Sequence, residues 1–334
     1  MIKTLITNVK RADGEDALYR FKSPYVLVHG KNGGGKSSIM HGLELACFGK
    51  VHDVVGKDIK LKRYLEYLSA EGSTVHARVN TSENLRLSYP ALASDEREDY
   101  INAVPLALDA IKGSKVAFAK FLLKYLEHDV ELSVPIHGWD AAVTSAKNHR
   151  EALLRVEEST AKRLRAHRAK LKELDIVTKY TSSDTTATER MDAEEDADKA
   201  KRHLKAIHRE MFRFVEEAWP PLAVYMQRFL PDGMGDAELI STDSDFTLGF
   251  ANRPYPSGAE TVALAVAFAA AVLPSERSIY IFPDRAYDAH TLGRLMNAVR
   301  IVPAVGVFVQ STVMPDNYEA EKLGWQTLSQ VLSR

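Results

Sequence analysis

Four glycines lie within residues 30–35, and Lys36 and Ser37 follow them directly. Gly30, Gly35, Lys36 and Ser37 have the spacing G-x-x-x-x-G-K-S, which is typical of a loop that binds nucleotide phosphates. Glycines adopt positive φ angles at little cost, so successive backbone N–H groups of such a loop can converge on phosphate oxygens. Lys36 would reach the β and γ phosphates, and Ser37 would offer its hydroxyl to Mg²⁺. These residues predict a site for a nucleoside triphosphate with Mg²⁺.

The segments on both sides of this loop fit the same use. Residues 25–28 are an apolar run typical of a short buried strand, and the chain from Ser37 onward has the pattern of a helix. A helix N-terminus attracts anions because its first N–H groups have no partner within the helix. A plain glycine-rich turn would leave this strand, loop and helix order unexplained.

Two segments of the last third of the chain could complete the site. Ser257 and Gly258 stand directly before an alanine-rich helix predicted at residues 260–272, so they could form a second anion-binding helix start. Ser257 could equally be an ordinary N-cap. A strand predicted at residues 278–282 leads to Asp284, whose carboxylate could hold Mg²⁺ from the side opposite Ser37. The alternatives are a strand followed by a simple proline turn, or Asp288 as the relevant acid.

Composition limits the class of protein. The chain has 334 residues, 45% of them hydrophobic, which is enough for two or three domains with sizeable cores. No apolar run approaches the roughly 20 residues of a membrane span, and the N-terminus lacks a signal-peptide layout, so we expect a cytoplasmic protein without a membrane partner. The single cysteine, Cys47, excludes an intrachain disulfide framework and a zinc site built from cysteine pairs. The net charge of −1 means that any nucleic-acid binding must come from a local basic patch.

The sequence divides into three expected parts, residues 1–140, 141–217 and 218–334. The middle part contains no proline or glycine and is densely charged, with a polar interruption in its centre, which predicts an antiparallel helical hairpin. Trp219, Pro220 and Pro221 are expected to end the hairpin. In the flanking parts, the stretch 107–126 is predicted to be helical, and strands are predicted at residues 2–9, 25–28, 74–79, 85–89, 238–241, 246–250, 278–282 and 305–309.

The second arm of the hairpin carries apolar residues at alternating steps of four and three, the 3.5-residue period of a coiled-coil seam. These residues are Ala193, Ala197, Ala200, Leu204, Ile207, Met211 and Phe214. The first arm is less regular. Its best register comprises Leu154, Glu157, Ala161, Leu164, Arg168 and Leu171. Two polar positions interrupt it, so we expect an imperfect seam.

Together these segments resemble the ABC-type ATPases of the SMC, SbcC and RecF group. Residues 30–38 match that family's G-x-N-G-x-G-K-S-S, residues 43–50 look like its helix-ending A-L-F-G-K, and residues 256–260 are similar to its signature L-S-G-G-E. Asp284 corresponds to the Walker B aspartate, and residues 286–289 to the D-loop. The resemblance implies an α/β fold, an ABC-type P-loop ATPase head formed from the N- and C-terminal halves with an inserted antiparallel coiled-coil hairpin.

The resemblance also implies roles for single residues. ATP would be bound by Gly30, Asn32, Gly33, Gly34, Gly35, Lys36, Ser37, Ser38, Ser257, Gly258 and Glu260. Lys36, Asp284 and Asp288 would be catalytic, and Ser37 and Asp284 would hold Mg²⁺. Two heads of the family sandwich two ATP molecules, so a homodimer is implied in which Ser257 and Gly258 contact the γ-phosphate bound by the other subunit.

Three positions depart from the family pattern. Arg285 stands where the family has a glutamate that polarises the attacking water, and a permanently protonated guanidinium cannot be that base. No glutamine occurs between Ser38 and Tyr225, so the Q-loop residue is missing. Gln310 begins a segment in which many relatives carry a histidine. We therefore expect an ATPase whose hydrolysis is slow or needs a partner.

Basic residues gather on the hairpin near the expected ATPase head. They are Lys162, Arg163 and Arg165 on the first arm and Lys199, Lys201 and Arg202 on the second. The resemblance implies that such a patch contacts the phosphates of duplex DNA, while a plain solvated helix face is the alternative. The expected function is an ATP-gated DNA clamp in DNA repair, recombination or genome defence, associated with the nucleoid when bound to DNA. The alternative is a nucleotide-dependent dimerisation scaffold that regulates a partner nuclease or other effector.

Overall fold

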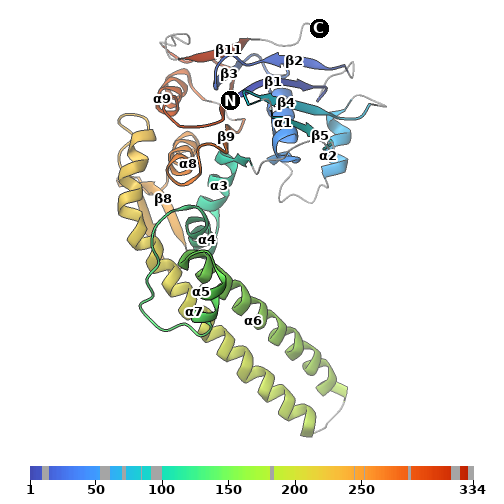
Figure 1. Cartoon of the computed structure of the whole chain (residues 1–334), viewed down its shortest axis with the longest axis vertical. Coiled ribbons are helices and arrows are strands. Elements are labelled where there is room, and N and C mark those ends of the chain that lie inside the picture. Colours follow the sequence, from blue (N-terminus) through green and yellow to red (C-terminus); the bar gives the residue numbers. More distant parts are fainter. Residues whose placement is uncertain are drawn as a thin grey trace. The chain divides into compact units, whose positions relative to one another are not determined.

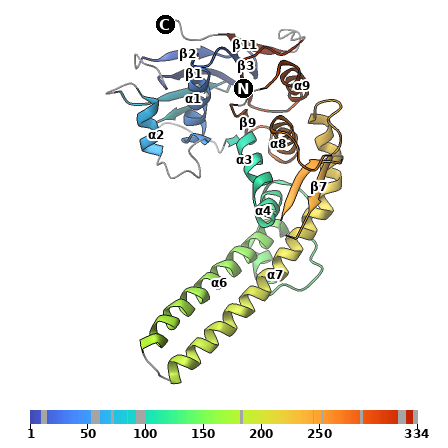
Figure 2. The same cartoon turned by 180° about the vertical axis from the view of Figure 1, so that it is seen from behind.

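The computed structural model divides the chain into two compact units (Figure 1; Figure 2). It describes residues 1–9, 15–52, 61–69, 73–83, 85–91, 100–180, 184–243, 245–251, 253–284, 287–316 and 324–329. The first unit comprises Met1–Lys112, Leu222–Thr242 and Thr247–Arg334, and the second comprises Gly113–Pro221 and Asp243–Phe246. The second unit is therefore largely an insertion between two parts of the first. Residues 113–140, grouped with the N-terminal part from the sequence, cluster with the second unit.

The first unit contains two larger β-sheets. The antiparallel sheet has the strand order β2-β1-β4-β5, with β1 at Ile2–Thr7, β2 at Ala17–Arg20, β4 at Ala77–Thr81 and β5 at Arg86–Tyr89. The parallel sheet has the order β11-β3-β10-β9-β6, with β3 at Tyr25–His29, β6 at Ile101–Asn102, β9 at Ser278–Ile281, β10 at Gly306–Ser311 and β11 at Trp325–Ser329. Strands β7 (Ala237–Ser241) and β8 (Phe246–Phe250) pair with each other. Each predicted strand is confirmed to within a few residues, whereas β2, β6 and β11 lack a sequence-based prediction.

Helix α1 (Lys36–Phe48) contacts strands of both larger sheets and forms the centre of the core. Its residues Ile39 and Leu43 are completely buried among side chains of both sheets. At Gly42 the helix comes so close to β1 that an added Cβ would lie 2.9 Å from Cγ2 of Thr7. Cys47 is also buried here, and burial raises the pKa of its thiol to about 12, which fits a packing role.

The described residues of the first unit form further helical segments. They are α2 (Leu61–Leu68), α3 (Ala103–Lys112), α8 (Gly258–Val272), α9 (Ala289–Val299) and the short 3₁₀ helix η2 (Gln227–Phe229). Helix α3 packs against α8, whose alanine-rich sequence is buried along nearly its whole length. Small side chains let the two helices approach closely. Among the helices in the described ranges, none has the length and hydrophobicity needed to cross a lipid bilayer.

The second unit is helical. It contains α4 (Lys115–Tyr125), α5 (Trp139–Ser145), α6 (His149–Tyr180) and most of α7 (Asp184–Met226). Helices α6 and α7 run side by side in opposite directions in both views (Figure 1; Figure 2). The predicted helical stretch at residues 107–126 is confirmed over most of its length, with a break after Lys112. Helix α3 ends at Lys112, and Ser114 caps a new helix by accepting a hydrogen bond from the backbone N–H of Ala117.

The sequence predicts that the hairpin ends at Pro220 and Pro221. This prediction is wrong, because α7 continues through both prolines. A proline inside a helix loses one backbone hydrogen bond and crowds the preceding turn. Ala218, Leu222 and Met226 recur every fourth residue and are all buried, so packing of this helix face offsets the loss. The division between the two units nevertheless falls directly after Pro221.

The buried faces of α6 and α7 follow the sequence only in part. On α7, Ala193, Ala197, Ile207, Met211 and Phe214 are buried as predicted. On α6 the predicted register is only partly right. Glu157 and Leu164 are buried as predicted. Arg168 is exposed, and Thr160 and His167 lie on the less exposed face instead. A pairing of Arg190 with Asp175, 2.8 Å apart, joins the two helices near their turn. Coiled-coil packing of this pair remains a prediction.

Candidate nucleotide-binding site

The phosphate loop connects β3 to α1 and has the backbone that its glycines predict. Gly33 and Gly35 have φ angles of 79° and 85°, a region that side chains disfavour, and Gly35 is the N-cap of α1. At Gly34 an added Cβ would lie 3.0 Å from the carbonyl oxygen of Lys31. The N–H of Gly30 donates to the carbonyl of Ser311, 3.2 Å away, which ties the loop to β10. The loop is thus held in a conformation that only this glycine pattern permits.

Lys36 is the buried cation of this loop. Its side chain is 7% exposed, and its ammonium donates to the carbonyl oxygens of Gly30 at 2.9 Å and Lys31 at 3.1 Å. Backbone carbonyls stabilise an ammonium less than an anion does, because they carry only partial charge. Phosphate oxygens would therefore compete well for this group, which fits the expected role of Lys36.

A cavity of about 430 Å³ opens beside the start of α1. Ser37 lines it from α1, and Asp284 lines it from the segment after β9. Strands β3, β10 and β9 are parallel neighbours, so the residues that follow β3 and β9 lie at the same edge of the sheet. The two predicted Mg²⁺ ligands, far apart in the chain, thus meet at one cavity.

The oxygens of Ser37 and Asp284 are of the type that Mg²⁺ prefers. Within the described residues, no group of three or more His, Cys, Asp or Glu side chains is arranged to hold a metal. A Mg²⁺ ion between Ser37 and Asp284 would therefore need the phosphates of the nucleotide as further ligands. This is the arrangement usual for Mg²⁺ bound together with a nucleoside triphosphate.

Several polar residues that line the cavity are not predicted from the sequence as site residues, among them Gln310 and Glu44. Gln310 on β10 is 4% exposed, and no described residue gives its side-chain oxygen a hydrogen bond. Glu44 on α1 is buried and accepts hydrogen bonds from Asn102 Nδ2 at 3.0 Å and from His52 N at 3.3 Å. The signal for Gln310 is its place at the end of a strand next to β3. Glu44 instead fixes neighbouring segments to α1.

The start of α8 has a complete capping box. The Ser257 hydroxyl accepts from the backbone N–H of Glu260 at 3.4 Å, and the Glu260 carboxylate accepts from the backbone N–H of Ser257 at 2.8 Å. Glu260 also pairs with Arg253 at 2.6 Å. Burial alone raises the pKa of Glu260, but the hydrogen bonds from Ser257 and the charge of Arg253 outweigh it and hold the pKa below its ordinary value. The structure thus shows the N-cap role of Ser257, and ATP contacts of Ser257, Gly258 and Glu260 remain a prediction.

Asp288 is the N-cap of α9. Its carboxylate accepts from the backbone N–H of Thr291 at 2.8 Å, and this bond lowers the pKa of Asp288. Asp288 is not among the described residues that line the cavity with Ser37 and Asp284. Its local role is therefore helix capping, and a catalytic role remains a prediction. Arg285 lies outside the described residues.

The six predicted nucleic-acid residues are all exposed on α6 and α7. Lys199 pairs with Glu195 at 2.8 Å on the same helix. Arg163 and Lys199 also line a common cavity between the two helices, so the structure brings one residue of each arm together. The contact of all six residues with nucleic acid remains a prediction.

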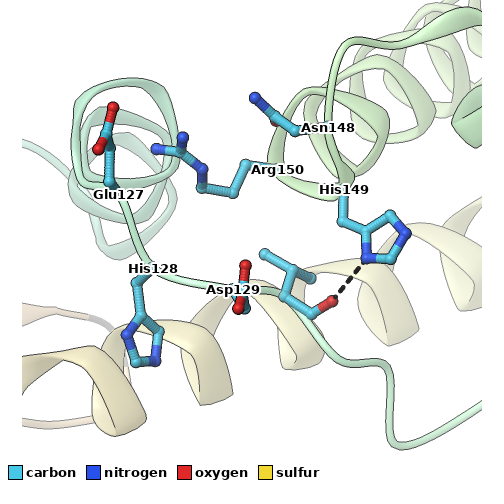
Figure 3. A pocket seen from close by; sticks show the side chains of 7 residues that line it. Glu127, His128, Asp129, Asn148, His149 and Arg150 are labelled. Carbon is cyan, nitrogen blue, oxygen red and sulfur yellow. Dashed lines mark hydrogen bonds between the residues drawn. The ribbon is translucent and has the colours of Figure 1, made fainter.

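A separate cavity of about 560 Å³ lies in the second unit, where α6 begins (Figure 3). Three of its polar side chains form local hydrogen bonds. His149 lies 3.2 Å from the carbonyl oxygen of Val130, Asn148 caps α6 by accepting from the backbone N–H of Glu151, and Arg150 donates to the carbonyl of Leu126. These bonds fasten the segment after α4 to α6, so we assign this cavity a structural role.

A profile of the protein family described as an AAA domain matches residues 6–212. The chain belongs to this AAA domain family. The matched residues include the phosphate loop, α6 and most of α7. The match confirms the expected resemblance to the ABC-type ATPases of the SMC and RecF group. No curated protein sequence matches this AAA domain chain.

Solved structures similar to this chain include RecF and Smc head domains. The structure of the recombination mediator protein RecF with ATP has a TM-score of 0.47 and 11% identity, covering 95% of this chain and 93% of that chain. The Smc head domain from Pyrococcus yayanosii has a TM-score of 0.43 and 12% identity, covering 93% and 92%. The Smc head domain from Pyrococcus furiosus, bound to a domain of ScpA, has a TM-score of 0.38 and 13% identity, covering 93% and 89%. These TM-scores are below 0.5, so the assignment rests on the family match and the motif residues.

Proposed function

We propose that this chain is an SMC/RecF-like ATP-binding protein whose heads pair around two ATP molecules and hold duplex DNA. The observation that supports it most is the shared cavity of Ser37 and Asp284 beside the phosphate loop. The settings proposed are DNA repair, recombination or genome defence, on the resemblance of the motifs. The proposed location is the cytoplasm, at the nucleoid when DNA is bound.

ATP binding is assigned to the loop and its flanking residues. The backbone N–H groups around Gly33, Gly34 and Gly35 would hold phosphate oxygens, and Lys36 would move its hydrogen bonds from carbonyls to phosphates. Ser37 and Asp284 would hold Mg²⁺, which neutralises phosphate charge when bound. Each of these contacts is stronger with ATP than with ADP, because the triphosphate carries more negative charge.

Slow hydrolysis is part of the proposal. Arg285 cannot accept a proton from the attacking water. Gln310 can orient a water molecule through its buried amide oxygen, but an amide is not a base. The sequence position after Asp284 therefore provides no general base, which favours a long-lived ATP-bound state.

The test is to measure ATP turnover of the purified chain with and without duplex DNA while light scattering reports its mass. We expect slow turnover, ATP-dependent dimers, DNA affinity that rises with ATP, and faster turnover in Arg285→Glu. Rapid turnover of the wild type would contradict slow hydrolysis and direct attention to another acid. Dimers that form with ATP but do not bind DNA would favour the dimerisation scaffold for a partner nuclease or other effector.

Ser257→Asp tests the proposed contact of α8 with ATP bound to a second copy. Aspartate caps helices as well as serine does, so we expect the folded state to keep its stability. A carboxylate facing the γ-phosphate would repel it, so ATP-dependent dimerisation should weaken at least about tenfold, which corresponds to about 1.4 kcal/mol. ATP affinity of the monomer should be unchanged, as measured by calorimetry at low protein concentration.

Ser114→Asp is the matched control, because Ser114 caps α4 in the same way. It should leave dimerisation unchanged. Equal effects of the two substitutions, or none for Ser257→Asp, would leave Ser257 with its capping role alone.

A further inference from the structure

The second unit contains a cavity of about 310 Å³ between α6 and α7 whose lining is rich in cationic and titratable groups. Three histidines, His137, His167 and His203, line it together with Arg163 and Lys199. A water molecule occupies about 30 Å³ in the liquid, so a group the size of phosphate fits this cavity with water to spare. The lining therefore combines space with several hydrogen-bond donors.

His203 is the group of this cavity that most needs a partner. Its Nε2 atom is buried, and no described residue forms a hydrogen bond with it. The rings of His203 and His137 lie 5.9 Å apart, centroid to centroid. A buried polar atom without a hydrogen bond costs free energy, and a ligand oxygen at Nε2 would remove that cost.

The charges of the lining favour an anion. Arg163 donates one hydrogen bond to the Thr160 hydroxyl at 3.3 Å. A guanidinium has five N–H groups, so others can donate to a bound anion. Asp196 is the carboxylate among the described lining residues, opposed by Arg163 and Lys199. Each histidine that gains a proton adds a further positive charge and a second N–H donor.

We propose that this cavity binds a phosphate group and that its affinity rises as His203 takes up a proton. The phosphate could come from a nucleic-acid backbone or from a free phosphate compound, and only the first source rests on the proposed DNA binding. Arg163 provides the constant charge, because Lys199 is already paired with Glu195 at 2.8 Å, and His203 provides the variable charge. The cavity would then hold one phosphate in a defined place, unlike the exposed cations of α6 and α7.

The direction of the pH effect follows from the groups that face His203. Burial lowers the pKa of His203, and the charges of Arg163 and His137 lower it further. His167 faces it from α6, and Asp196 and Lys199 face it from α7. A bound anion favours the protonated ring, so binding takes up protons and the affinity increases as the pH falls through the histidine range.

Sulfate is the first probe, because its charge stays constant where phosphate itself titrates near pH 6. We expect calorimetry to show sulfate and inorganic phosphate binding to the full chain, at least about tenfold weaker in Arg163→Gln. Sulfate affinity should rise about threefold or more from about pH 8 to about pH 6. The His203→Gln variant should lose this pH dependence. In that variant, adding Arg163→Gln should still weaken sulfate binding.

Arg168→Gln is the matched control, since Arg168 is an exposed cation of the same helix that is not among the lining residues. It should change sulfate affinity less than twofold, and circular dichroism should show equal helix content in all variants. Equal losses in Arg163→Gln and Arg168→Gln, or no sulfate binding at millimolar concentrations, would overturn the proposal.

Fluorescence anisotropy with labelled duplex DNA separates the two phosphate sources. Competition between DNA and sulfate, lost in Arg163→Gln, would support a backbone phosphate as the ligand. Sulfate binding without any DNA binding would support the cavity as a free-phosphate site and contradict the proposed DNA clamp. DNA binding that is unaffected by Arg163→Gln would contradict the cavity as the DNA contact and leave the clamp standing.

Discussion

Lys36→Met is expected to weaken ATP binding about 10- to 100-fold. The substitution keeps the length of the side chain and removes its charge. A hydrogen bond to a charged group contributes about 1.5–3 kcal/mol, and each 1.4 kcal/mol corresponds to a factor of ten in affinity. The ammonium is already positioned by Gly30 and Lys31 at 2.9 and 3.1 Å, so little entropy is lost when phosphates replace these carbonyls. Calorimetry with ATP and Mg²⁺ measures the change.

Lys31→Met provides the control for Lys36→Met. Lys31 belongs to the same loop, but its side chain is exposed and only its backbone carbonyl contacts Lys36. Its substitution removes the same charge from the loop without removing the buried donor. ATP affinity should change less than about threefold. Similar losses in both variants would show that ATP senses the general charge of the loop, and the assigned role of Lys36 would be wrong.

Lys120→Met is expected to destabilise the second unit by about 3 kcal/mol. Lys120 on α4 lies 2.6 Å from the carboxylate of Glu157 on α6, whose side chain is 4% exposed. His208 of α7, 3.3 Å away, is the other partner described for this carboxylate. Removing Lys120 leaves a buried carboxylate with one weaker partner, and a buried charge without compensation is costly. Urea unfolding followed by far-UV circular dichroism measures the loss.

The pH dependence of this variant gives a second test. In the wild type, burial raises the pKa of Glu157, but the hydrogen bonds from His208 and Lys120 outweigh it and hold the pKa below its ordinary value of 4.5. The contribution of Glu157 to stability is then present above pH 4.5 and is lost as the pH falls. Without Lys120, the pKa of Glu157 should be higher than in the wild type, because His208 alone of its described partners then opposes the effect of burial. The variant should therefore gain stability relative to the wild type as the pH is lowered toward 4.5.

Two further variants separate the charge from the packing of Lys120. Lys124→Met removes an exposed lysine of the same helix and should change stability by less than about 0.5 kcal/mol. Lys120→Met combined with Glu157→Leu removes both charges and should recover most of the lost stability. A double variant as unstable as Lys120→Met would show that the stem of Lys120, and not the ion pair, stabilises the contact between α4 and α6.

Several features were predictable because they depend on residues close together in the chain. The phosphate loop is one, since the glycine spacing around Lys36 permits the φ angles of Gly33 and Gly35. The buried face of α7 is another, because apolar residues at steps of four and three lie on one side of a helix whatever surrounds it. The N-cap role of Ser257 also follows from its place before Glu260.

Local patterns were misleading where packing opposes them. Prolines break isolated helices, yet α7 continues through Pro220 and Pro221. Its apolar face is buried both before and after the two prolines, which offsets their cost. On α6 the polar residues Thr160 and His167 lie on the less exposed face, and Arg168 is exposed. A polar side chain is tolerated there because a neighbouring helix or loop completes its surroundings, which the sequence of α6 alone does not contain.

The sequence by itself determined the phosphate loop, the two long helices and the residue types available to bind ATP. Only the tertiary structure decided which of these residues meet. Ser37 and Asp284 share a cavity because β3, β10 and β9 are parallel neighbours, and this pairing also buries Gln310 beside them. It likewise decided that Arg163 and Lys199 line one cavity with His203 while Asp288 caps a helix. The physical reason is that spacing along the chain sets local conformation, whereas distances between segments depend on the pairing of strands and the packing of whole helices.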